Sequence, residues 1–405
     1  MTLSLERRSL LAAAAAMTAT SRRARAANKP LKIGVLNDMT GVFADYQGPG
    51  SAVAARMAAE DAAAIAGRPI EIVTGDHQNK PDIGMVIARR WIDQEGVDVI
   101  LDVPNSAVAL AVAGLARERN KVFICSGAGL TDLTTSRCSP NTVQWTYDSW
   151  QLSHTLGRAI TLGGGKTWFL LNSDYAFGAD LERNMTDAVT KVGGTIVGTV
   201  KHPFPATDFS SYLLAAQASG AQVLGLNNAG DDLVNAIKQA GEFGLMRTMK
   251  IAAPVFNVNM VHAVGLLGAQ GVLGVTSFYW DANDASRAFA TRFAAALRSH
   301  AMPNDMQAGC YSGLMHLAKA LAKIGGTEDG AAVVAAMKAI PTSDGLFGEG
   351  VIRADGRKIH PIHLIEAKTP AESTGPWDYF KVITTIPADE AYRPMAEGGC
   401  ALVRP

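Results

Sequence analysis

The sequence predicts an α/β protein made of two lobes, each built around a parallel β-sheet. From residue 31 onward, short runs rich in Val and Ile alternate with stretches of helical period. Such βαβ repetition gives a parallel sheet that is covered by helices on both faces. The alternation pauses near residues 145–150 and then begins again. Two series of comparable length therefore predict two similar lobes, each with its own sheet.

Strands and helices alternate within each series. Short apolar runs bounded by polar turns mark the strands, and apolar positions three or four apart mark the helices. In the first series, strands are expected at 31–36, 70–74, 97–103 and 121–125, with helices at 51–64 and 82–95. In the second series, a helix at 150–161 precedes strands at 166–172, 195–200, 222–226 and 250–254.

The end of the chain departs from this alternation. An apolar run at 271–278 is followed by helical stretches at 285–299, 307–324 and 330–340, and by short strands at 350–353, 361–366 and 379–384. We expect the late helices and the first short strand to complete the first lobe, and the last strands to return to the second. The first lobe is then 29–147 plus 278–358, the second is 148–277 plus 359–405, and a three-crossing hinge lies near 146–149, 276–279 and 357–361.

Residues 1–26 are predicted to be a signal peptide. Arg7 and Arg8 precede a small apolar run at 10–20, and residues 24–26 form a small-x-small cleavage pattern, which is how secretory signals are built. The paired arginines indicate the twin-arginine export route. The alternative is a plain disordered N-terminus. Export predicts a periplasmic protein.

Charge and hydropathy exclude two classes of partner. Removing residues 1–26 leaves 32 basic and 36 acidic residues, a net charge of −4. A chain without a basic surplus offers no electrostatic footprint for nucleic acid. After the N-terminus, no uncharged apolar run reaches the roughly 18 residues that a membrane-spanning helix needs.

The sequence has four cysteines, and none of them forms a metal-binding C-x-x-C pair. Cys125 and Cys310 lie in apolar patterns and are expected to be buried. Cys138 and Cys400 lie in polar, turn-like segments, so they form the expected disulfide in an oxidising compartment. The alternative pairing is Cys125 with Cys138.

No catalytic motif is present. The sequence contains no G-x-S-x-G, Walker loop or H-E-x-x-H. Residues 163–166 resemble a phosphate loop only in composition, because they follow a helix and precede a strand. Asp76 and His77 end a strand, but no further His or carboxylate stands at a supporting spacing. We therefore predict no catalytic residues, no metal site and no cofactor.

Polar and small residues collect where the expected strands end. Five segments share this position in the two lobes: 37–48, 104–106, 125–134, 172–178 and 226–230. Ligands bind at the carboxyl ends of parallel strands in such folds. Asn105 and Ser106 start a helix, where free N–H groups and a hydroxyl favour an anion such as a carboxylate. The sequence therefore predicts a ligand cleft between the lobes.

With these segments in this order, the sequence resembles the type I periplasmic binding proteins of the leucine/isoleucine/valine-binding family. The resemblance runs from about Lys32 to the C-terminus. It is carried by Ile33-Gly34-Val35, Thr40-Gly41, Gly48, Asp76, Ser126-Gly127-Ala128, residues 174–178, Ala240-Gly241, residues 285–293 and Phe347-Gly348-Glu349-Gly350.

The resemblance implies two Rossmann-like lobes that close on a small-molecule ligand. It also implies a monomer without catalytic activity, which delivers its ligand to the membrane permease of an ABC importer. The alternative role on the same lobes is a ligand-sensing regulatory subunit. A hydrolase or redox enzyme is the alternative from another class.

The family's binding positions transfer to this chain one at a time. Tyr46 matches the aromatic residue of the first loop, and Ser106, with Asn105 before it, matches the hydroxyl that caps the ligand carboxylate. Ala128 and Gly129 match the backbone stretch after the fourth strand. In the second half, the matching positions are Asp148 at the hinge, Tyr175 and Phe177 after the next strand, and Asn228 in the following loop.

Two departures from the family pattern bear on the ligand. Leu130 stands where amino-acid binders carry a Thr, with Thr131 as the candidate substitute, and residues 254–257 lack the acid that meets a ligand ammonium. An ammonium buried without a counter-charge is costly. The aromatic residues Tyr175, Phe177 and Phe256 instead favour an aromatic monocarboxylate.

The strings at 77–82 and 138–142 resemble the branch of the family that binds aromatic acids. Two alternatives stay open: a branched-chain amino acid or amide as ligand, and a Phe256 that only packs beneath its loop.

Overall fold

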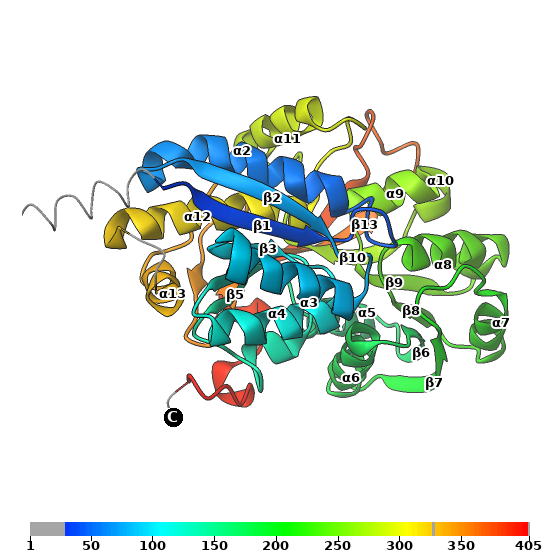
Figure 1. The fold of residues 1–405 in the computed structure, drawn as a ribbon. Helices are drawn as coiled ribbons and strands as arrows, with labels where there is room; N and C mark the ends of the chain where they lie inside the picture. The colour runs from blue at the N-terminus through cyan, green and yellow to red at the C-terminus, as the bar shows by residue number, and fades with distance from the viewer. Residues whose placement is uncertain (1–28, 326–328, 404–405) are drawn as a thin grey trace, which may run out of the picture.

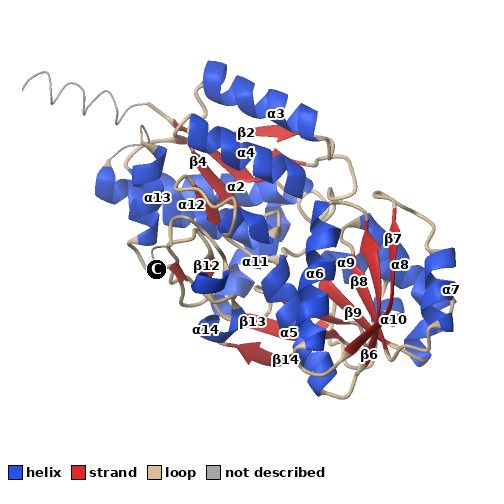
Figure 2. Cartoon of the chain, turned by 90° about the horizontal axis from the view of Figure 1, so that it is seen from below, coloured by secondary structure: helices blue, strands red, loops and turns tan. Residues whose placement is uncertain are grey.

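The protein folds into two α/β lobes, as the sequence predicts (Figure 1). The computed structural model describes residues 29–325 and 329–403. The predicted signal peptide lies outside the described residues. Figure 2 separates the lobe that holds β2 and β4 from the lobe that holds β6 to β9. Among the described residues, no helix has the length and apolarity needed to span a membrane.

The first lobe contains a five-stranded parallel sheet in the order β2-β1-β3-β4-β5. Its strands are β1 (Leu31–Asn37), β2 (Ile70–Asp76), β3 (Val99–Asp102), β4 (Val122–Cys125) and β5 (Thr142–Gln144). Its helices are α2 (Gly48–Ala66), α3 (Pro81–Arg90), η1 (Trp91–Glu95), α4 (Ser106–Glu118), η2 (Thr131–Thr134), α11 (Asp284–Ala296), α12 (Asp305–Ile324) and α13 (Gly330–Lys338).

Alternating residues of these strands feed two cores, one on each face of the sheet. Val99 and Leu101 of β3 pack with α2, α11, α12 and α13. Ile100, which lies between them in the chain, packs with α3 and α4 on the opposite face. Strand β5 was not predicted from the sequence. It has only three residues, both polar and apolar, and it lies at the edge of the sheet.

The second lobe contains a seven-stranded mixed sheet in the order β14-β13-β10-β9-β8-β6-β7. Strand β13 runs antiparallel to both of its neighbours, β10 and β14, and the other pairs are parallel. The strands are β6 (Thr167–Ser173), β7 (Thr195–His202), β8 (Val223–Asn227), β9 (Lys250–Val255), β10 (Leu273–Thr276), β13 (Ile362–Ala367) and β14 (Phe380–Ile386). The helices are α5 (Ser149–Leu162), α6 (Ala176–Thr190), α7 (Ser210–Ala218), α8 (Asp231–Glu242), η3 (Leu245–Arg247), α9 (Val258–Val264), α10 (Leu266–Ala269), α14 (Ala388–Ala391) and η4 (Met395–Glu397).

The chain passes between the two sheets after β5, after β10 and before β13. The short hairpin of β11 (Val351–Ile352) and β12 (Lys358–Ile359) precedes the third passage. Arg357, which is fully buried, ties the third passage to the first. Its guanidinium donates to the carbonyl oxygens of Gln144 at 2.9 Å and Thr146 at 3.1 Å, and pairs with Asp148 at 2.7 Å.

The end of the chain is fastened back to the first half. Cys400 forms a disulfide with Cys138, 262 residues earlier, and their Cα atoms lie 5.7 Å apart. Cys125 and Cys310 are free and buried. The sequence left two pairings open for Cys138, and the structure contains the one with Cys400.

Candidate functional site

The carboxyl ends of β1, β3 and β4 meet around one buried carboxylate, Asp102. Its oxygens accept hydrogen bonds from Asn37 Nδ2, Gln47 Nε2 and Ser126 Oγ, the last two at 3.0 Å. Burial raises the pKa of Asp102 to about 6. The carboxylate therefore binds the loops after three strands into one rigid wall of the first lobe.

The backbone at this wall is strained. Asp102 and Val103 have φ values of 81° and 62°, and a β-branched residue with positive φ is a genuine outlier. Strain of this kind persists only where surrounding contacts over-determine it, and it clusters at functional sites. Residues 104–106 and the start of α4 follow this strained segment directly.

Asn105 and Ser106 differ in their bonding, although the sequence predicts a ligand contact for both. The Asn105 side chain caps α4 by accepting from the amides of Ala107 at 2.9 Å and Val108 at 3.1 Å. Its oxygen is thus occupied by its own helix. The Ser106 hydroxyl, in a residue that is 1% exposed, has no hydrogen-bond partner within the described chain. Ser106 is therefore the donor that stays available to a ligand.

The loop after β4 holds Ala128 and Gly129 by their carbonyl groups. Gln144 Nε2 donates to the Ala128 carbonyl at 3.1 Å, and the Gly129 carbonyl accepts from the amide and hydroxyl of Ser149 at 2.7 and 2.9 Å. A Cβ on Gly129 would lie 2.4 Å from the Tyr147 ring and 2.7 Å from the Phe177 ring. Only glycine lets these two rings reach the backbone here.

Thr131 contacts the second lobe. Its amide and hydroxyl donate to the Asp180 carboxylate on α6 at 2.8 and 2.9 Å. Both side chains are buried. The hydroxyl that was predicted to replace the family's ligand-binding Thr is thus engaged in a bridge between the lobes.

Aromatic rings from both lobes face each other. In the second lobe, Tyr175 stacks on Phe204, with ring centroids 4.1 Å apart. Phe204 lies 5.7 Å from Phe43 of the first lobe, and Phe43 lies 5.7 Å from Tyr46. Phe177 in turn approaches Tyr147 at 6.4 Å. These six rings come from four segments, after β1, β5, β6 and β7, and form the aromatic walls between the lobes.

Tyr46, Tyr175 and Phe177 were predicted from the sequence as ligand contacts, whereas the other three rings were not. Tyr147 stands in an aromatic-rich segment, between Trp145 and Trp150, and that was the available signal. Phe43 and Phe204 are single aromatic residues in loops, and nothing in their spacing shows that they meet.

Asp148 and Asn228 differ sharply in their bonding. Asp148 caps α5 by accepting from the Gln151 amide at 2.9 Å and pairs with Arg357, so it braces the hinge. Asn228, after β8, is fully buried, and both polar atoms of its amide lack partners within the described residues. Asn228 is therefore the predicted residue that is most open to a ligand contact.

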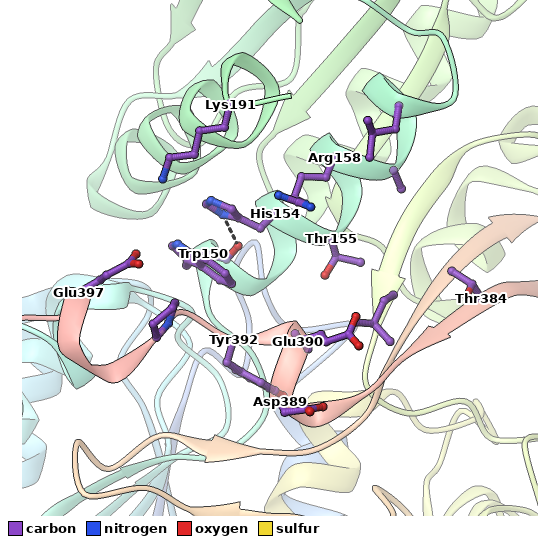
Figure 3. A pocket seen from close by; sticks show the side chains of 15 residues that line it. Trp150, His154, Thr155, Arg158, Lys191, Thr384, Asp389, Glu390, Tyr392 and Glu397 are labelled. Atoms are coloured by element: carbon purple, nitrogen blue, oxygen red, sulfur yellow. Dashed lines mark hydrogen bonds between the residues drawn. The ribbon is translucent and has the colours of Figure 1, made fainter. Parts of the chain in front are cut away.

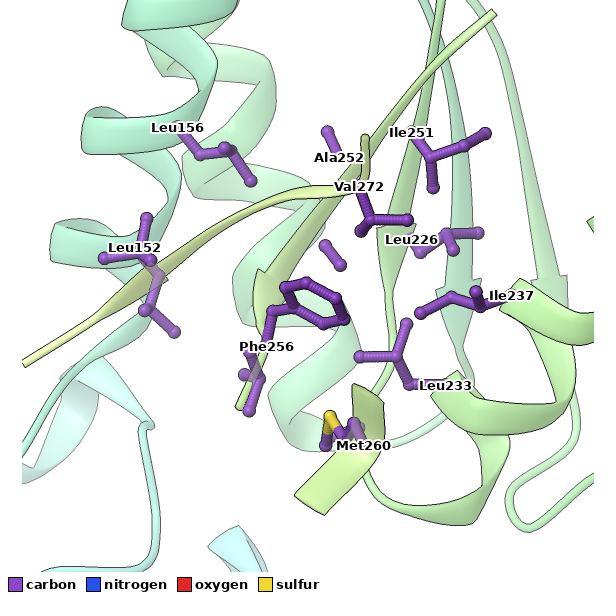
Figure 4. Packing of buried hydrophobic residues seen from close by; sticks show 14 of the residues in the cluster. Leu152, Leu156, Leu226, Leu233, Ile237, Ile251, Ala252, Phe256, Met260 and Val272 are labelled. Atoms are coloured by element: carbon purple, nitrogen blue, oxygen red, sulfur yellow. The ribbon is translucent and has the colours of Figure 1, made fainter. Parts of the chain in front are cut away.

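Phe256 does not join the cleft, and its prediction as a ligand contact is corrected here. It is 1% exposed and lies in the core of the second lobe among Leu152, Leu233 and Met260 (Figure 4). Its ring lies 5.3 Å from that of Phe380 on β14. The residue at the end of β9 points under its loop because an apolar ring gains more by joining this core.

A groove of about 590 Å³ lies outside the cleft, beside α5 (Figure 3). Trp150, His154 and Arg158 of α5 line one side, and Glu390 and Tyr392 line the other. None of the predicted ligand residues lines it.

The described residues contain no cluster of three or more His, Cys, Asp or Glu side chains that could hold a metal ion.

The lobes are in contact around the cleft. The Asp231 amide of the second lobe donates to the Val42 carbonyl of the first at 3.1 Å, and Asn304 Nδ2 donates to Asn259 Oδ1 at 2.8 Å. Two α/β lobes that share a multi-crossing hinge and close over an interior lined by strand ends define a ligand-capturing receptor.

A periplasmic binding protein family model matches residues 30–375. A periplasmic binding protein of known structure from Burkholderia mallei is 45% identical, covers 93% of this chain and 99% of its own, and superposes with a TM-score of 0.89. The chain belongs to the periplasmic binding protein family, which confirms the resemblance seen in the sequence. At this level the chain is a periplasmic binding protein.

Two further solved structures of similar fold have names that state a ligand or a class of ligand. A branched-chain amino acid ABC transporter periplasmic ligand-binding protein from Burkholderia xenovorans is 38% identical, with 92% of this chain and 99% of that chain covered and a TM-score of 0.82. A solute-binding protein of an ABC transporter from R. palustris, in complex with benzoate, is 21% identical, with 92% and 100% covered and a TM-score of 0.81. The second likeness concerns the fold alone.

Proposed function

We propose that this protein captures a small aromatic monocarboxylate between its lobes and presents it, as an exported monomer, to the membrane permease of an ABC importer. The observation that carries the proposal is the pair of aromatic walls. Tyr46 and Tyr147 come from the first lobe, and Tyr175 and Phe204 come from the second. Stacked and edge-on ring contacts favour an aromatic ligand beyond the area that they bury.

Donors for a carboxylate are grouped on the first lobe. The Ser106 hydroxyl and the amide N–H groups of Ala128 and Gly129 have no hydrogen-bond partner within the described residues, whereas the neighbouring carbonyl groups are occupied. Hydrogen bonds to a charged acceptor are about twice as strong as neutral ones. This grouping supports a ligand whose carboxylate meets the first lobe.

A free carboxylate for an ammonium is lacking at the start of α9, where Asn257 caps the helix by accepting from the Met260 amide at 3.2 Å. Asp102 already accepts hydrogen bonds from three side-chain donors. These contacts disfavour an α-amino acid. A branched-chain amino acid remains the second candidate, because the name of the Burkholderia xenovorans relative favours it.

Closure follows from where the contacts lie. The first lobe offers the carboxylate donors on a rigid wall, and Tyr175, Phe204 and Asn228 of the second lobe can reach the ligand only when the lobes meet. Contacts made in the closed state alone shift the population toward it. The permease then recognises a shape that exists mainly when ligand is bound.

The test is a binding screen of the protein without residues 1–26. Thermal shift and calorimetry would be run with benzoate, hydroxybenzoates, hydroxycinnamates, leucine, valine and urea-like amides, since a ligand of the folded state raises the melting temperature. We expect aromatic acids to bind and leucine not to bind. Binding of leucine or valine, with none of the aromatic acids, would overturn the proposed ligand class.

A matched pair of variants locates the carboxylate. Ser106→Ala should weaken aromatic-acid binding by about tenfold, because one charge-assisted hydrogen bond is lost. Ser153→Ala is the control: Ser153 is equally buried and unpartnered, but it lies within α5. Equal loss of affinity in both variants would speak against a role for Ser106 at the ligand.

A further inference from the structure

Asn228 is a buried polar residue whose side chain makes no hydrogen bond that would give it a structural role. It follows β8, is fully buried, and neither Nδ2 nor Oδ1 has a hydrogen-bond partner within the described residues. Its neighbour Asn227 is also buried and its Oδ1 likewise lacks a partner, but its Nδ2 donates to Asn172 Oδ1 on β6 at 2.7 Å. The Asn227 side chain is therefore hydrogen-bonded to the neighbouring strand, whereas the Asn228 side chain is not. Buried polar groups left unpaired in a native protein call for an explanation.

The segment around Asn228 lies against the first lobe. Gly230, two residues on, has a φ of 65°, and a Cβ there would lie 2.3 Å from the Val42 carbonyl oxygen and 3.0 Å from the Phe43 ring. The Asp231 amide bonds that same carbonyl. Asn228 is therefore at the edge of the second lobe that faces Val42 and the aromatic ring of Phe43 in the first lobe.

The chemistry of a carboxamide restricts its partner. Asn offers one oxygen acceptor and one NH₂ donor. A carboxylate can only accept and an ammonium can only donate, so each would leave half of the Asn228 amide unpaired. A hydroxyl group both donates and accepts, and so satisfies both halves.

We propose that Asn228 recognises a hydroxyl group on the ligand, at the end remote from its carboxylate. This inference rests on the proposed function and narrows it, from aromatic acids in general to hydroxylated ones. Ser106, Ala128 and Gly129 hold the charged end on the first lobe, and Asn228 reads the neutral polar end on the second. A site built to hydrogen-bond a hydroxyl rejects the analogue that lacks it, because its buried polar atoms stay unpaired.

The experiment is a cycle of two ligands and two proteins. Calorimetry would compare 4-hydroxybenzoate and 3-hydroxybenzoate with benzoate on the wild-type protein and on Asn228→Leu, which keeps the shape but not the amide. We expect the wild type to prefer a hydroxybenzoate over benzoate by about 10- to 100-fold. Asn228→Leu should lose that preference, so that it binds the hydroxybenzoates and benzoate with similar affinity.

Asn228→Ala is the second variant if the Leu variant does not fold, and its melting temperature is measured without ligand. A preference for hydroxybenzoate that persists in the variants overturns the inference, as does a wild type that binds benzoate equally well. In both cases the proposed ligand class still stands. If no aromatic acid binds the wild type, the proposed ligand class fails, and the inference fails with it.

Discussion

The amide and hydroxyl of Thr131 in the first lobe both donate to the Asp180 carboxylate in the second, at 2.8 and 2.9 Å. Thr131 is 2% exposed and Asp180 is 1% exposed, so water does not screen this contact. Burial raises the pKa of Asp180, and its hydrogen bonds to Thr131 act in the opposite direction by favouring the ionised form. The bridge thus joins η2 to α6 in the closed arrangement.

Asp180→Asn should weaken ligand binding by about tenfold. It replaces charge-assisted hydrogen bonds by neutral ones and so destabilises the closed state to which the ligand binds. Calorimetry measures the affinity, and small-angle scattering measures the degree of closure. Asp187→Asn is the control, because Asp187 lies on the same helix but pairs only within the second lobe, with His154 and Lys191. If both variants bind as tightly as the wild type, the bridge does not govern closure.

Gly129→Ala should also weaken ligand binding. An added methyl group would lie 2.4 Å from the Tyr147 ring and 2.7 Å from the Phe177 ring, so both rings must move, and overpacking of this kind typically costs about 1–3 kcal/mol. Chemical denaturation and calorimetry measure the two effects. Gly114→Ala is the matched control: Gly114 lies in α4 with open space around it. That variant should gain about 0.5–1 kcal/mol of stability and bind normally. A Gly129→Ala protein with unchanged affinity would show that these rings do not shape the ligand site.

The fold and the positions of the strand ends could be predicted from the sequence because both depend on local periodicity. The alternation of strands and helices placed Ser106, Asn228 and the loop after β4 at strand ends, and each of them follows a strand in the structure. Side-chain partners across the lobes depend instead on tertiary contacts. Nothing near Thr131 in the sequence indicates Asp180.

The two phenylalanine errors have the same cause. Phe256 and Phe204 both follow strands of the second lobe, and the sequence does not show which one turns inward. Phe256 joins the core under its loop, whereas Phe204 stacks on Tyr175 between the lobes. The sequence shows that each residue is aromatic and lies in a loop. The direction of its side chain depends on how the neighbouring helices and strands pack, which the local pattern does not show.

Removing the disulfide should destabilise the protein without changing its affinity for ligand. The bridge closes a loop with a sequence separation of 262 residues, and the loss of such a constraint on the unfolded chain typically costs about 2–5 kcal/mol. The double variant Cys138→Ala, Cys400→Ala is compared with the wild type by chemical denaturation and calorimetry. Cys138 and Cys400 lie apart from the aromatic walls, so a large loss of affinity at full folding would contradict the expected separation of roles.

The hinge contains a buried lysine, Lys358, beside Arg357. Its ammonium lies 4.1 Å from the centre of the Phe347 ring and 4.9 Å from that of Trp145, and it contacts His360 Nδ1 at 3.4 Å. The pKa of Lys358 is lowered to about 7, mainly by burial; the charge of Asp344 opposes this shift, and the charge of Arg357 adds to it. Burial also lowers the pKa of His360, so that ring is neutral at and above pH 7.

Stability should therefore rise with pH above neutrality. Lys358 is protonated below about pH 7 in the folded protein, but below 10.5 in the unfolded chain. Between these values the unfolded chain binds more protons, so the free energy of unfolding increases with pH, by at most about 1.4 kcal/mol per pH unit from this residue. Below pH 7 both states are protonated and the cost of the buried charge is constant. Lys358→Met should be more stable at pH 7 and lose this slope in denaturation curves. Lys319→Met, at an exposed position on α12, should keep it. Parallel curves for Lys358→Met and the wild type would mean that Lys358 does not release its proton within the fold.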